Sequence, residues 1–200
     1  MYKSAPNPRT RRSCIAGFSM VELAVSLAVL LILTAIAIPS LMRSFRAYQL
    51  NAAAARLSDT LKFTRFEAVR RNRPINFLVL ASGTGWLVGT DSNNNGLFDT
   101  GEKQVPMSGF GTLLPAGAPP SSASILATLG ATSSLNASKS GAAGSITFDA
   151  RGAVAPLVAY VFYLGSATNP EFGYRAVILL PSGATQIWSA PNGGTWQQIR

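Results

Sequence analysis

Oxygen-bearing side chains recur between residues 91 and 102 with the spacing of a twelve-residue calcium-binding loop. Oxygen ligands fall at its first, third, fifth, ninth and twelfth positions, Gly stands sixth, and the seventh residue would contribute a backbone carbonyl; the candidate ligands are Asp91, Asn93, Asn95, Leu97, Asp99 and Glu102. Calcium prefers such clustered oxygens, so the spacing predicts a calcium site. The helices that flank an EF-hand loop are missing, because Trp86–Thr90 has the pattern of a strand. The alternative is a hairpin loop, rich in Asn and Gly, that closes on itself through Asx turns.

A single acid, Glu22, stands just inside an apolar segment. The segment continues from Leu23 to Met42 for 20 residues without a charge. As a helix it would span about 30 Å, the thickness of the hydrocarbon core of a bilayer. A carboxylate that enters lipid without a partner costs on the order of 2.5–3.5 kcal/mol near the middle of the membrane. Glu22 therefore predicts a partner that comes from outside this segment.

The residue types that most enzymes use are scarce. The chain has no His, and its single Cys, Cys14, precedes the apolar segment. No local spacing resembles a Ser-x-x-Lys nucleophile, a pair of catalytic carboxylates or a phosphate-binding loop. We therefore predict that the protein is not an enzyme.

Gly17, Phe18, Glu22 and the long apolar helix resemble the processing site of type IV prepilins and type II secretion pseudopilins. The resemblance implies that prepilin peptidase cuts between Gly17 and Phe18, that Phe18 is then N-methylated, and that Glu22 faces the terminal amine of a neighbouring subunit during assembly. Pro39 stands where the family has a proline that kinks the helix. One alternative is an ordinary signal anchor. Another is a secretory signal cut after Ala35-Ile36-Ala37, although the apolar run is longer than such signals usually carry.

Composition divides the chain into a leader at 1–17, a transmembrane helix at 18–42, an amphipathic continuation of that helix at 43–73, and a β-rich domain at 74–200. Residues 43–73 carry eight bases against two acids, whereas the residues from 74 onward carry five of each. Apolar residues recur in steps of three and four through 50–68, which predicts one buried helix face. Within the domain, residues 115–145 are mostly Ala, Gly, Ser or Pro, and we expect a long low-complexity loop there, with a short helix or strand near Ile125–Leu129.

Short segments rich in β-branched and aromatic residues predict the strands of the domain. They are Ile75–Leu80, Trp86–Thr90, Ile146–Phe148, Leu157–Leu164, Arg175–Leu180 and Thr185–Ser189. Pro181-Ser182-Gly183 predicts a hairpin turn between the last two.

Within the pilin-like proteins, the order and spacing of several segments resemble the GspH/FimT group, which comprises secretion pseudopilin H and FimT-type minor pilins. The segments are Arg65–Pro74, Gly85–Val88, Asp91–Glu102 and Ile146–Gly152. The resemblance implies an α+β pilin-like fold, in which a long N-terminal helix packs on antiparallel sheets.

The resemblance also implies a function. We expect a minor subunit of a type II secretion pseudopilus, with a minor pilin of a type IV pilus or a signal-anchored periplasmic binding domain as alternatives. Its partners would be prepilin peptidase, other pilins or pseudopilins, and inner-membrane lipid. Some FimT-like pilins bind DNA through a C-terminal Gly-Arg-x-Arg motif, but the tail here has only Arg200, so nucleic acid is not expected. The expected location is the bacterial inner membrane, with a cytoplasmic N-terminus and a periplasmic domain, and then the filament.

Overall fold

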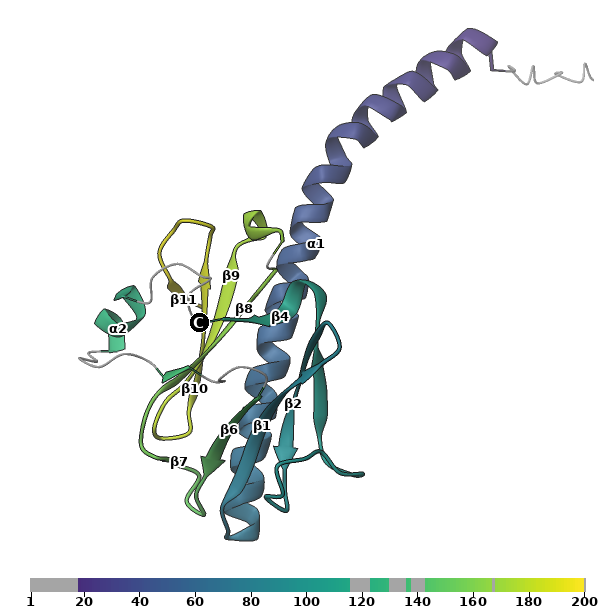
Figure 1. Ribbon diagram of the computed structural model, residues 1–200. Helices are drawn as coiled ribbons and strands as arrows, with labels where there is room; N and C mark the ends of the chain where they lie inside the picture. Colours follow the sequence, from purple (N-terminus) through teal and green to yellow (C-terminus); the bar gives the residue numbers. More distant parts are fainter. Residues whose placement is uncertain (1–17, 116–122, 130–135, 138–142, 167, 200) are drawn as a thin grey trace, which may run out of the picture. The chain divides into compact units, whose positions relative to one another are not determined.

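Residues 18–115, 123–129, 136–137, 143–166 and 168–199 are described by the computed structural model (Figure 1). They fall into two units, residues 1–41 and 42–200. One helix, α1 (Met20–Arg71), contains the described residues of the first unit from Met20 onward and continues into the second. It continues through Pro39, so this proline does not end the helix.

The second unit contains two sheets (Figure 1). The first has the strand order β3-β2-β1-β6-β7 and is antiparallel throughout; its strands are β1 (Ile75–Ser82), β2 (Gly85–Asp91), β3 (Gln104–Met107), β6 (Ala143–Phe148) and β7 (Val154–Ala155). The second has the order β11-β10-β9-β8-β4, and β5 joins β8 in parallel; its strands are β4 (Thr112–Leu114), β5 (Asn136–Ala137), β8 (Tyr160–Gly165), β9 (Tyr174–Leu179), β10 (Thr185–Ala190) and β11 (Gln197–Ile199). The remaining elements are α2 (Ala123–Leu129) and the 3-10 turns η1 (Gly109–Gly111) and η2 (Pro170–Phe172).

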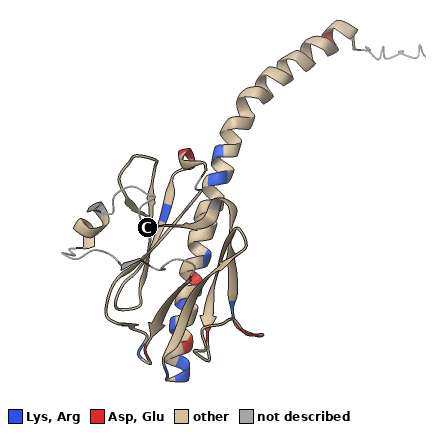
Figure 2. Cartoon of the chain, in the orientation of Figure 1, with Lys and Arg blue, Asp and Glu red and all other residues tan. Residues whose placement is uncertain are grey.

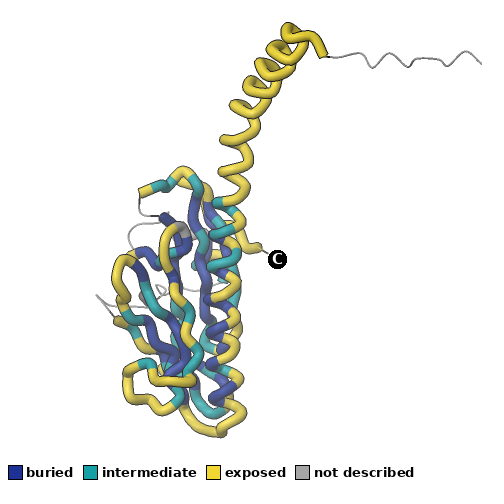
Figure 3. Tube along the Cα trace, turned by 90° about the vertical axis from the view of Figure 1, so that its right-hand side faces the viewer, coloured by how far each residue is buried: buried dark blue, intermediate teal, exposed yellow. Residues whose placement is uncertain are grey.

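The main core lies between α1 and both sheets. Beyond residue 50, one side of α1 is buried and the other is exposed (Figure 3). Leu57 and Leu61 of α1 join Phe77 of the first sheet and Phe162 of the second in one fully buried cluster. The two phenylalanine rings meet edge to face with centroids 5.7 Å apart. Burial of this apolar stripe is what attaches α1 to the sheets.

Hydrogen bonds set the register of α1 on the sheets. The hydroxyls of Thr64 and Thr90, both buried, lie 2.7 Å apart, and those of the buried Ser58 and the partly buried Thr185 lie 2.8 Å apart. Arg65 donates from Nε to the carbonyl of Gly152 at 3.0 Å. Ser58 and the adjacent pair Thr64 and Arg65 thus tie two levels of α1 to the sheets, so sliding of the helix would break these bonds and leave polar atoms unpaired.

A second apolar cluster covers the other face of the second sheet. Trp188, Trp196 and Tyr163 of that region pack with Ile125 of α2, which is fully buried. The low-complexity segment therefore contributes a buried residue through α2, within the stretch predicted as a short helix or strand. Residues 116–122, 130–135 and 138–142 of that segment lie outside the described residues.

The predicted strands are found with shifted ends, and the Pro181–Gly183 turn joins β9 to β10. The strand predicted to start at Leu157 starts instead at Tyr160, and Leu157 is exposed. Strands β3, β4, β5, β7 and β11 were not predicted, because each has only two to four residues and too little periodicity. The helix ends at Arg71, two residues before the predicted end, and Asn72 follows with a positive φ of 47°.

Candidate functional site: the apolar helix, the acidic loop and a polar cleft

The first unit exposes an apolar helix. All its described residues are exposed, and the segment is apolar and long enough to cross a membrane. An unburied apolar surface of this size requires lipid or other helices around it. Thr34 donates its hydroxyl to the carbonyl of Leu30 at 2.6 Å, so that its polar hydrogen is satisfied within the helix. These features are those of a membrane anchor.

Glu22 lies in the first turn of α1. Ser19 precedes the helix and accepts a bond from the backbone N–H of Val21 at 3.3 Å. An acid in the first turn is favoured by the partial positive charge of the helix N-terminus. Phe18 is exposed, whereas Gly17 lies outside the described residues. The cut, the methylation and the assembly role of Glu22 therefore stay predictions.

The Asp91–Glu102 loop, called the acidic loop below, connects β2 to β3. Hydrogen bonds between its side chains and its backbone hold it closed. The Asp91 carboxylate accepts the N–H groups of Asn95 at 3.2 Å and Gly96 at 2.9 Å. Glu102 accepts the N–H of Ser92 at 2.6 Å through one oxygen and that of Asp99 at 3.0 Å through the other. These are the bonds expected of the Asx-turn alternative.

The side-chain amides of Asn93 and Asn95 also form hydrogen bonds within the loop. Asn93 and Asn95 donate to Asp99 Oδ2 at 2.6 and 2.8 Å, and their own oxygens accept the N–H groups of Asn95 and Leu97. Phe98 lies over β2, where a Cβ on Gly89 would come within 2.8 Å of its ring. Leu97 is 62% exposed. The loop thus presents an apolar tip beside an exposed carboxylate, that of Asp99.

Calcium binding stays a prediction of the sequence spacing. Among the residues that the structure describes, no group of three or more His, Cys, Asp or Glu residues could hold a metal ion. The loop oxygens accept hydrogen bonds instead, so a bound calcium ion would have to replace several of these bonds.

Calorimetric titration of the purified full chain with calcium tests this site. Binding predicts heat that saturates at one ion per chain and is lost in Asp91→Asn, since this change removes a charged ligand. Asp149→Asn, in a separate turn, is the matched control and should bind as the unaltered chain does. A titration without heat would contradict the calcium prediction.

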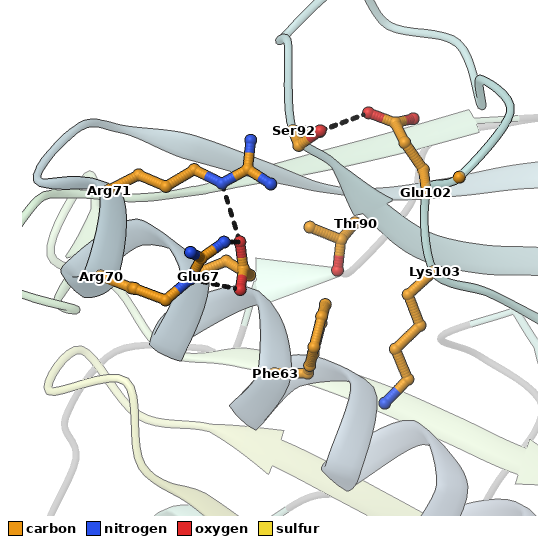
Figure 4. Close-up of a pocket in the computed structure, with 9 residues that line it drawn as sticks. Phe63, Glu67, Arg70, Arg71, Thr90, Ser92, Glu102 and Lys103 are labelled. Atoms are coloured by element: carbon orange, nitrogen blue, oxygen red, sulfur yellow. Dashed lines mark hydrogen bonds and ion pairs between the residues drawn. The ribbon is translucent and has the colours of Figure 1, made fainter.

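A polar cleft of about 280 Å³ lies between the end of α1 and the acidic loop (Figure 4). In it, Glu67 accepts two bonds from Arg70 at 2.9 and 2.7 Å and one from Arg71 at 2.8 Å. Lys103 places its ammonium 4.6 Å from the centroid of the Phe63 ring, a cation–π contact. An acid in the last turn of a helix is disfavoured by the helix dipole, and the two guanidinium groups offset this cost. The bonds of Glu67 to Arg70 and Arg71 therefore stabilise the end of α1.

The pKa of Glu67 is lowered mainly by its hydrogen bond to Arg70; burial opposes this shift and Arg71 adds to it. Because the folded protein favours the ionised form, this contribution to stability is fully present above the pKa of the unfolded carboxyl, about 4.3. It is lost as the pH falls through the lower pKa of the folded state. Glu67→Gln is expected to reduce the free energy of unfolding at pH 7 and to have much less effect at pH 3.

Urea denaturation of both proteins at the two pH values, followed by tryptophan fluorescence, checks this expectation. Asp59→Asn is the matched control, because Asp59 forms a surface ion pair with Lys62 in which both side chains are more than half exposed. Such a pair contributes about 0–1 kcal/mol. An equal effect of Glu67→Gln at both pH values would contradict the role given to its charge.

The cluster of Glu67, Arg70 and Arg71 was not predicted as a site from the sequence. Its signal was present, since an acid followed by bases three and four residues later is a stabilising helical pattern. The pattern could not show that Glu67 is buried beside β2. In the described part of the chain, many basic residues lie along α1, and three of the acidic residues lie on the loop after β2 (Figure 2).

Comparison with known proteins places these features in a family. The family model described as "Type II transport protein GspH" matches residues 53–183, which is more than half of the chain. The matched region begins in α1 and ends at the turn between β9 and β10. It includes the acidic loop and the polar cleft, but not the apolar helix end.

Two crystal structures of the type IV minor pilin FimU from Pseudomonas aeruginosa are similar to this chain. The first has 16% sequence identity and a TM-score of 0.49, over 76% of this chain and 94% of that one. The second has 19% identity and a TM-score of 0.41, over 76% and 98%. None of the curated proteins matches the chain. The extent of the family match, together with the helix-and-sheet architecture, shows that this chain belongs to the GspH family of pilin-like minor subunits.

Proposed function

We propose that the protein is a minor pseudopilin of a type II secretion system, made as a precursor and inserted in the inner membrane. The observation that carries this proposal is the family match over residues 53–183, because the name of that family refers to type II transport. Its members are structural subunits, and membership implies assembly with other pilins in a filament. A structural role also agrees with the polar cleft, whose two carboxylates are both engaged in bonds that hold the fold together.

The chemistry of assembly is a charge pairing in an apolar setting. Prepilin peptidase cuts between Gly17 and Phe18, which leaves the amine of Phe18 at the start of α1. Glu22 of one subunit then meets the amine of another. A buried carboxylate and a buried ammonium are each costly alone and much less costly together. The exposed apolar face of α1 supplies the packing around this pair.

Mass spectrometry of the mature N-terminus tests the processing step. The chain is expressed in cells with and without prepilin peptidase, purified from membranes and digested. The expected terminus is N-methyl-Phe18 with the peptidase and the uncut leader without it. An intact Met1 in both strains, or a mature start at Ile38, would contradict the proposal.

Deletion of the gene in the bacterium that carries it separates the two kinds of filament. A type II pseudopilin predicts that secreted enzymes accumulate in the periplasm while surface pili and twitching motility persist. Loss of pili with normal secretion would assign the protein to a type IV pilus instead. Complementation with the unaltered gene is the control.

A further inference from the structure

A groove of about 500 Å³ lies between α1 and the end of β3 together with the turn η1 that follows it. Arg46, Ala52, Ala53 and Arg56 line it from α1, and Pro106 and Met107 line it from the opposite side. All belong to the second unit. At η1 the backbone comes close to the helix, since a Cβ on Gly111 would lie 2.4 Å from the Cβ of Ala53. The lack of a side chain at Gly111 therefore permits this close approach beside the groove.

The groove is basic, and the spacing of its two arginines favours an extended ligand over a small one. None of its lining residues is acidic. Arg46 and Arg56 are ten residues apart on α1, about 15 Å along the helix axis. One phosphate group could reach only one of them, whereas an acidic peptide segment could contact both. Between them, Ala52 and Ala53 leave room for an apolar side chain.

The same chain carries a segment of matching chemistry. In the described residues after α1, the large hydrophobic side chains left exposed are Leu97, Leu157 and Ile199. Of these, only Leu97 lies within two residues of an exposed acid, Asp99. Asp99 is the exposed carboxylate of this loop, since Asp91 is fully buried and Glu102 is partly buried, whereas the groove contributes two arginines. The apolar side chain of Leu97 and the negative charge of Asp99 thus complement the small apolar residues and the arginines of the groove.

The loop and the groove lie at different levels of α1, so one molecule cannot join them. Arg73, just after the helix, donates to the carbonyl of Ser92 at the start of the loop. From the middle of the groove, near residue 51, to the end of α1 at Arg71 is about 20 residues, or about 30 Å. A contact between these two surfaces must therefore join two molecules. Because the surfaces differ, the contact is head to tail.

We propose that this groove receives the Asp91–Glu102 loop of a second copy of the chain. Leu97 of the entering loop lies against Ala52 and Ala53, and Asp99 pairs with Arg56. The proposal rests on the chain being a filament subunit, but not on which filament it joins. It adds a contact between the globular domains to the pairing of the apolar helices.

Disulfide cross-linking of the full chain in membranes tests the contact. Cys14 is first replaced by Ser, and Leu97→Cys is made in a tagged copy and Ala52→Cys in an untagged copy. Co-expression under mild oxidation is expected to give a mixed dimer that disappears on reduction. The matched control joins Leu157→Cys to Ala52→Cys, because Leu157 is equally apolar and exposed but is not on the acidic loop; this pair should not cross-link.

Charge reversal gives a second readout. Arg56→Glu is expected to lower the yield of the mixed dimer about tenfold or more, and Asp99→Lys in the partner copy is expected to restore it. Arg151→Glu, at an exposed turn, should leave the yield unchanged. Thermal unfolding of each variant checks that the fold persists.

Absence of the mixed dimer, a yield that ignores charge, or capture of Leu97→Cys only by a different pilin would overturn the proposal. These outcomes are distinguishable from failure of the proposed function, because the N-terminal cut and secretion are measured separately.

Discussion

Glu22→Ala is expected to leave the precursor cut and anchored in the membrane while reducing its incorporation into filaments about tenfold or more. Removing one member of a buried ion pair leaves the other charge without a partner, at a cost of about 3–5 kcal/mol. The amine of Phe18 in the neighbouring subunit would be that charge. The cut itself should persist, because the proposed cleavage site, between Gly17 and Phe18, does not include Glu22. Immunoblots of sheared filaments and of membranes measure incorporation, and mass spectrometry measures the cut.

Ser26→Ala is the matched control, since it removes a polar group one turn further along the same helix without removing a charge. It should be incorporated as the unaltered chain is. Normal incorporation of Glu22→Ala would count against the pairing role of Glu22 and would favour a signal-anchored domain that does not polymerise.

Phe77→Ala is expected to lower the free energy of unfolding of the second unit by about 3–5 kcal/mol. Phe77 is fully buried where α1 and both sheets meet, and its ring contacts that of Phe162 edge to face. The substitution removes apolar contacts and leaves a cavity that rigid neighbours fill only partly. Urea denaturation of the full chain in detergent measures the change, because all three tryptophans lie in the β-rich region and report on it.

Phe66→Ala provides the control on the same scale of side-chain volume. Phe66 lies on α1 but is 62% exposed, so its loss should change the free energy of unfolding by no more than about 0.5 kcal/mol. Equal effects of the two substitutions would contradict the placement of the core between α1 and the sheets.

Patterns short enough to act locally were read correctly from the sequence. The apolar run without charges predicted the helix, and its stepwise continuation predicted the buried face that includes Leu57 and Leu61. Alternation and turn residues located β1 and β2 and the turn between β9 and β10. Family membership was carried by the order of weak segments, each of which alone would have been insufficient.

Such local patterns did not predict the contacts between segments that are distant in the sequence. The very short strands, such as β7 and β11, exist because a longer neighbour offers them hydrogen bonds, so their own residues carry little signal. The start of β8 at Tyr160 reflects its pairing with β9, which reaches Leu179 there. In the acidic loop, the sequence allowed both a metal site and an Asx-turned hairpin, and the bonds of Asp91 and Glu102 are those of the hairpin.

The functional features of this protein also fall into two groups, those set by local sequence and those set by tertiary packing. Membrane anchoring and the precursor motif depend on hydropathy and on neighbours within a few residues, and these can be judged without coordinates. The division into two sheets, the burial of Glu67 beside β2 and the basic groove opposite Pro106 depend on residues far apart in the chain that packing brings together. Such contacts arise because each apolar face must find a partner to exclude water, and which partner it finds is a property of the whole fold.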